Sequence, residues 1–138
     1  MEVIRERDDV VAIAERHFKS QAWIGQPILG DPGNETAETV YFEISSGSEA
    51  KLMLYLGPAP QPFRERLFAA AKSAGSPFAV KADLTPQWTQ LLRYMLVSKS
   101  EVAELTGDQC GELAVKRLIT FLDENLRRID SVVLSVPT

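Results

Sequence analysis

The chain has one cysteine and one histidine among its 138 residues, and each scarcity excludes a class of chemistry. A single cysteine, Cys110, excludes an internal disulfide and any cysteine-rich zinc site. A single histidine, His17, would have to serve any Ser-His-Asp arrangement, yet it falls on the apolar side of a predicted helix. We therefore interpret His17 as a packing residue and Cys110 as a small buried residue.

The chain also lacks an excess of positive charge and any long apolar run. Its 15 Lys and Arg residues against 19 Asp and Glu residues give a formal net charge of −4. This balance leaves little charge for binding nucleic acid or an anionic membrane surface. No stretch approaches the roughly 18 apolar residues of a membrane span, and the N-terminal segment has no apolar signal core. We predict a cytoplasmic protein that contacts neither a membrane nor nucleic acid.

What remains is the composition of an ordinary globular domain, with 45% hydrophobic and 25% charged residues. A chain of this length can close a hydrophobic core without disulfides. Its sequence shows no repeat and no linker between domains. We therefore predict a single domain over residues 1–138.

Apolar and polar side chains alternate through the segment Thr39–Leu56, TVYFEISSGSEAKLMLYL. Alternation places successive side chains on opposite faces of a strand, and the turn-forming residues 46–50 divide the segment into two arms. If Ser46 pairs with Ala50, one face of this β-hairpin carries only Val, Ile, Leu and Phe, and a slip by one residue would expose them all. The predicted pairs are Val40 with Leu56, Phe42 with Leu54, and Ile44 with Leu52.

The opposite face of the predicted hairpin pairs Tyr41 with Tyr55 and Glu43 with Met53. Two tyrosines and a methionine form a rather apolar surface to leave in water, and such patches are often contact surfaces. We predict that Tyr41, Met53 and Tyr55 bind a protein partner, which includes a second copy of the chain. The alternative is that the first predicted helix of the chain covers them.

Helical spacing of apolar residues predicts further elements around the hairpin. In the helix that begins at Pro62 and is capped by Gly75, Phe63 and Leu67 face the core and Arg64 faces water. A loop with a Pro-Gly pair, over residues 30–38, is predicted to be exposed. The predicted helices cover residues 8–20, 62–75, 100–105 (capped by Ser100) and 108–129.

Three segments have less definite patterns. Residues 78–80 are predicted as a short strand, and the tail Val132–Val136 as a final strand or a loose apolar arm. The segment Trp88–Val97 fits a helix capped by Thr85 and equally fits an alternating strand, so periodicity does not separate the two. The fold class is α+β: a small antiparallel or mixed sheet around the central β-hairpin, with helices packed on it.

Glu49-Ala50-Lys51 is the one local pattern with a named chemistry. In metal-dependent nucleases, an acid and a lysine two residues apart on a strand point into one site. There the acid and an upstream aspartate bind Mg²⁺, and the lysine positions the attacking water. Asp31 is the upstream candidate here. We favour the competing interpretation, in which Glu49 and Lys51 simply keep a hairpin tip soluble, so no cofactor is expected outside the nuclease alternative.

The region Val40–Ile129 resembles the C-terminal half of PD-(D/E)xK nuclease-like proteins of bacteria and phages. The likeness is one of element order: a hairpin ending in LYLGP, a helix beginning FRERLFAAAK, a short strand, the segment WTQLLRYMLVS and the helix ELAVKRLITFLDENLRRI. In those proteins the tryptophan segment is similar to a strand, which favours a strand here. Their catalytic strand precedes the matched region, so the resemblance implies an inactive form of the fold, kept for binding.

The outline of the chain is also similar to that of small acidic secretion chaperones, which act as dimers that hold an extended client. From all these observations we predict a non-enzymatic protein-interaction domain that self-associates. The alternatives are a divergent Mg²⁺-dependent nuclease that uses Asp31, Glu49 and Lys51, and a secretion-type chaperone.

Overall fold

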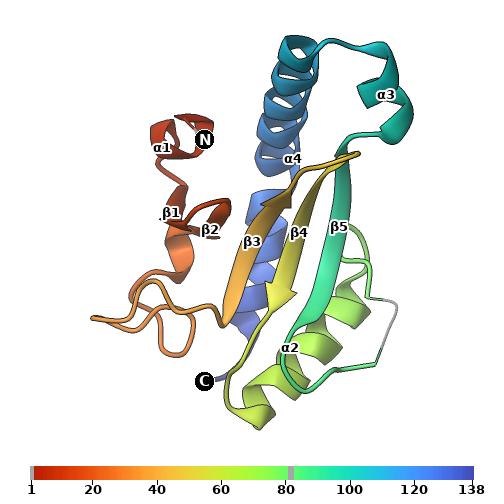
Figure 1. Cartoon of the computed structure of the whole chain (residues 1–138). Helices are drawn as coiled ribbons and strands as arrows, with labels where there is room; N and C mark the ends of the chain where they lie inside the picture. The colour runs from red at the N-terminus through yellow and green to blue at the C-terminus, as the bar shows by residue number, and fades with distance from the viewer. Residues whose placement is uncertain (1, 81–82) are drawn as a thin grey trace.

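The computed structural model describes residues 2–80 and 83–138, and it is built around a five-stranded antiparallel sheet (Figure 1). The strands lie in the sheet in chain order, β1-β2-β3-β4-β5. The predicted α+β class is confirmed. The elements are α1 (Glu2–Glu6), β1 (Val10–Ala14), β2 (His17–Ser20), the 3-10 turn η1 (Gln21–Trp23), β3 (Val40–Ser45), β4 (Ala50–Leu56), α2 (Gln61–Ala74), β5 (Thr89–Val97), α3 (Lys99–Glu104) and α4 (Gly107–Ser135).

The predicted central hairpin and its register are confirmed. β3 and β4 pair antiparallel, and the observed pairs include Val40 with Leu56, Phe42 with Leu54, and Ile44 with Leu52. All six side chains are buried in the core. Figure 1 shows α2 and α4 behind the β3–β4–β5 part of the sheet, and we call this covered side the inner face. The other side, which no helix covers in that view, is the outer face.

The predicted helix over residues 8–20 is wrong. This segment forms the β1–β2 hairpin, which turns at Glu15 and Arg16, and Arg16 adopts a left-handed φ of 61°. Val10 and Phe18 do belong to the core, but they reach it from two antiparallel strands rather than from successive turns of a helix. The β-branched residues of VVAIA favour a strand, and helical spacing arose by coincidence of two short alternating runs.

The segment that periodicity left open is a strand, as the resemblance favoured. β5 pairs antiparallel with β4, with Leu54 opposite Leu92 but the next residue, Tyr55, opposite Gln90. The bulge makes Leu91 an extra residue, so it breaks the alternation and mimics helical spacing. The predicted strand over residues 78–80 does not form. Its main-chain contact with β5 is a hydrogen bond from Ala79 N–H to the Leu91 carbonyl at 2.9 Å, which is too little to make a strand ladder.

α2 begins one residue before Pro62 and is followed by Gly75. The φ of Gly75 is 71°, a value that glycine adopts more easily than other residues. Phe63 and Leu67 are buried, as predicted. The prediction that Arg64 faces water is wrong, because this residue is 1% exposed. A helical pattern counts arginine as polar, but it cannot show that main-chain carbonyls of other segments surround this position.

Hydrogen-bonded caps define the last two helices. Ser98, rather than the predicted Ser100, caps α3, and Thr106 caps α4. The predicted strand or loose arm at the tail is wrong: α4 continues to Ser135, with Val133 buried. No proline interrupts the sequence from residue 87 to 136, so the helix meets no breaker. Among the described helices, none is both long enough and apolar enough to cross a membrane.

Candidate interaction surfaces

The three residues predicted to form a binding surface meet on the outer face of the sheet. The rings of Tyr41 and Tyr55 have centroids 5.8 Å apart, and the Tyr55 hydroxyl donates to Met53 Sδ at 3.3 Å. Their packing hides most of them, since Tyr41 and Met53 are each 5% exposed and Tyr55 is half-buried. The predicted residues therefore lie together but offer little free apolar area.

Charged neighbours cover much of this cluster. His17 on β2 lies with its ring centroid 4.8 Å from that of Tyr41. Its Nε2 is 2.8 Å from Glu43 Oε1, and its Nδ1 is 3.7 Å from Glu38 Oε2. Burial and these two carboxylates raise the pKa of Tyr41 to about 12. The outer face is thus a layer of aromatic rings rimmed by charge, and His17 of β2 lies against Tyr41, where the alternative interpretation had placed a helix.

The structure does not bring the predicted nuclease residues together. At the hairpin tip, Glu49 Oε1 lies 3.4 Å from Lys51 Nζ and 3.3 Å from Arg93 Nη2. Asp31 lies in the loop before β3, where its carboxylate accepts from the main-chain N–H of Ile28. β3 has six residues between that loop and the tip, a length of about 20 Å. No group of three metal-ligating side chains occurs in the described part of the chain.

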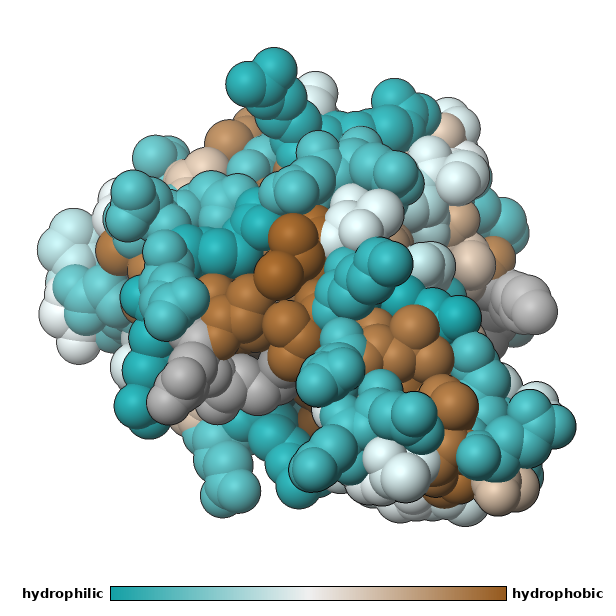
Figure 2. Space-filling model, turned by 90° about the horizontal axis from the view of Figure 1, so that it is seen from above, coloured by the Kyte–Doolittle hydropathy of each residue, from teal (hydrophilic) through white to brown (hydrophobic). Residues whose placement is uncertain are grey.

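An apolar surface that the sequence reasoning missed lies at the end of the molecule formed by the hairpin tip, α3 and the first half of α4. Val102 and Val115 are 36% and 38% exposed there. A cleft of about 380 Å³ opens between the three elements. Figure 2, which looks down on this end, shows brown apolar surface near its middle. The side chains that line the cleft include Val97, Val102, Leu105, Cys110 and Ala114.

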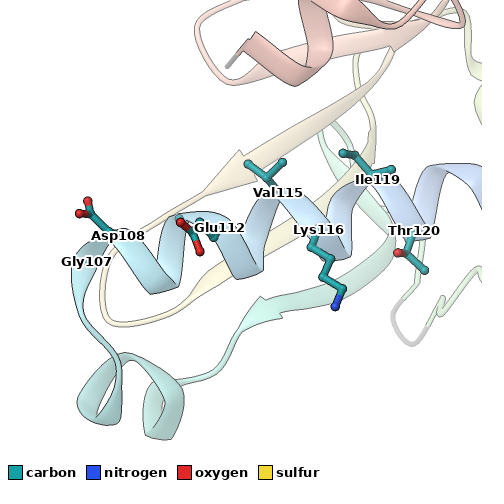
Figure 3. A pocket seen from close by; sticks show the side chains of 8 residues that line it. Gly107, Asp108, Glu112, Val115, Lys116, Ile119 and Thr120 are labelled. Atoms are coloured by element: carbon teal, nitrogen blue, oxygen red, sulfur yellow. The ribbon is translucent and has the colours of Figure 1, made fainter.

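A second groove, of about 760 Å³, runs along the neighbouring side of α4 (Figure 3). Figure 3 shows Val115 and Ile119 pointing to one side of the helix and Lys116 and Thr120 to the other. The groove is lined from α4 alone, by Gly107, Asp108, Gly111, Glu112, Val115, Lys116, Ile119 and Thr120. The first half of the longest helix is therefore exposed along two sides.

The reason for this exposure is a difference in length. α4 has 29 residues, which corresponds to about 44 Å, whereas the seven residues of β4 extend only about 23 Å. The helix therefore extends past the sheet, and its first turns lack a covering layer. Leu113 and Ala114, which lie in these first turns, are only half-buried. The sequence could have indicated this exposure, because the predicted last helix is much longer than the predicted strands.

The chain matches no protein-family model, no curated protein and no solved structure. The resemblance to nuclease-like proteins stays a prediction.

Proposed function

We propose that the chain is a non-enzymatic protein-interaction domain that binds an apolar segment of another protein in the cleft between the hairpin tip, α3 and α4. The observation that carries this proposal is the cleft itself. Its walls are aliphatic, and Val102 stands exposed at its edge. Apolar area of this kind gains free energy when a partner removes it from water.

The chemistry of the cleft favours a partner that inserts one or two large apolar side chains. Buried apolar anchors in a pocket commonly supply most of the binding free energy of an interface. Glu49 lies at the rim, where Lys51 and Arg93 already neutralise it. A bound segment would therefore meet an apolar floor and a polar, charge-balanced rim, as in other protein–protein contacts.

Two matched variants test the proposal. Val102→Glu places a charge in the cleft, and Leu134→Glu places the same charge at another exposed apolar position, which is 44% exposed near the end of α4. Tagged wild-type and variant proteins are used to capture partners from a lysate of the source cells, with mass spectrometry as the readout. We expect one protein to be retained by the wild type and by Leu134→Glu, and lost by Val102→Glu.

Capture of the same proteins by all three chains would overturn the assignment of the cleft. Capture of no protein by the wild type at low salt would overturn the proposed function. Because both positions are exposed, circular dichroism and thermal unfolding should show both variants folded, which makes the comparison fair.

A secretion-type chaperone is the second candidate function. The order of a short initial helix, an antiparallel sheet and a long last helix supports it, as does the net charge of −4. In that case the captured protein would be a client that the domain keeps soluble, and a light-scattering assay of the purified client would show less aggregation in its presence.

A further inference from the structure

Gly111 is a residue that the fold of a single chain does not explain. It lies in the second turn of α4, and a Cβ atom built there would meet nothing within 4 Å. Glycine inside a helix lowers helix stability relative to alanine. Nothing in the described part of the chain requires the missing side chain, so its absence favours a neighbour outside the chain that approaches this backbone closely.

The residues around Gly111 are complementary to themselves. Val115 and Ile119 follow it at four-residue spacing on the wall of the second groove, so a small and a large residue lie one turn apart. Glu112 and Lys116 form the adjacent row, with opposite charges one turn apart. Within residues 2–80 and 83–138, neither charge belongs to a salt bridge, whereas Glu101 and Arg117 nearby are paired.

We propose that α4 of a second copy of this chain packs antiparallel along this groove. A two-fold axis that passes between residues 113 and 114 places Gly111 of each copy against Val115 of the other. The same axis places Glu112 of each copy opposite Lys116 of the other. Four-residue ridges of two helices interdigitate in the commonest class of helix packing, and a two-fold interface must be self-complementary.

A second copy of the chain satisfies both the packing of Gly111 against Val115 and the pairing of Glu112 with Lys116. It does so because it necessarily carries the same charges and the same sequence of small and large residues. An unrelated partner would need an independent match to each. This self-association goes beyond the capture of a partner in the cleft, since Glu112, Val115 and Lys116 line the groove and not the cleft, although Gly111 lines both. Charge reversal at Glu112 and Lys116 therefore lets the two proposals fail separately.

Charge reversal tests the predicted contact between copies. Sedimentation velocity over a range of concentrations gives the association constant of the wild type, Glu112→Lys, Lys116→Glu and the double variant. Each single reversal places like charges across the interface, so we expect the association constant to fall by at least about tenfold. The double variant restores opposite charges between copies and should associate as the wild type does.

A second pair of variants tests the close approach. A Cβ atom at Gly111 meets nothing within 4 Å in a single chain, so Gly111→Leu should leave thermal stability equal or higher, yet it should abolish self-association. Glu124→Leu adds the same side chain at an exposed position of α4 outside the groove and should leave association unchanged. The proposal is overturned if the wild type is monomeric at every concentration, if the double reversal does not restore association, or if Gly111→Leu still pairs.

Discussion

At the scale of single residues, Arg64 is a charged side chain that the fold buries. Within the described residues its guanidinium has no carboxylate partner, and it donates to main-chain carbonyls. Nε donates to the Gly57 carbonyl at 2.9 Å, Nη1 to that of Thr85 at 2.7 Å and Nη2 to that of Gln87 at 2.9 Å. The planar fork of arginine suits such a fan of acceptors. These hydrogen bonds therefore connect α2 to the end of β4 and to the loop that precedes β5.

We expect Arg64→Met to lower the free energy of unfolding by about 3 kcal/mol, because it leaves several buried carbonyls without a donor. Arg64→Lys keeps the charge but not the fork, so it should lose nearly as much. Arg66→Met, on the exposed side of the same helix, serves as the control and should change stability little. Urea unfolding measures all three. Equal stabilities for the Arg64 and Arg66 variants would contradict this role.

At the scale of elements, a charged pair joins the last two helices. Arg117 on α4 donates to both carboxylate oxygens of Glu101 on α3, at 2.8 and 2.9 Å, and also to the Leu96 carbonyl of β5 at 3.0 Å. Glu101 also accepts from the main-chain N–H of Ser98 in the capping box. The hydrogen bonds from Arg117 and Ser98 lower the pKa of Glu101 to about 2.

This pairing predicts a pH dependence of stability. The folded state favours the carboxylate, so the contribution of Glu101 is complete above its ordinary pKa of 4.5 and is lost as the pH falls toward 2. Urea unfolding between about pH 6 and pH 3 should therefore show wild type losing its advantage over Glu101→Gln as the pH falls. Glu104→Gln, exposed on the same helix, is the control. A constant difference between wild type and Glu101→Gln would contradict the assignment.

The elements also show which parts of this fold can be predicted from sequence. The β3–β4 register was predictable because one face of both arms is apolar and a slip would expose it. The β1–β2 hairpin was not, since four- and five-residue strands are too short for alternation to outweigh a helical pattern. The burial of Arg64 depends on carbonyls up to 23 residues away in sequence, which no local pattern records.

At the scale of the whole molecule, the exposed surfaces depend on how far each element extends. The pairs Tyr41–Tyr55 and Glu43–Met53 formed as predicted, but the contacts of His17 with Tyr41 and Glu43 depend on β2 being a strand. The exposed first half of α4 depended on its overhang beyond the sheet. Sequence patterns state which side of an element is apolar, whereas accessibility depends on the lengths of its neighbours. The candidate surface was for that reason found in the structure and not in the sequence.

The chain-order arrangement of the sheet has a consequence for synthesis on the ribosome. Each strand can pair with the strand made just before it. Between β4 and β5 the ribosome also makes the helix α2. The helix α4, which lies on the inner face beside α2 (Figure 1), is made after every strand. A nascent chain that has not yet released α4 would therefore present a paired sheet whose inner face lacks the cover of that helix. During that interval we expect the chain to need the general chaperones that shield exposed apolar surface on emerging polypeptides.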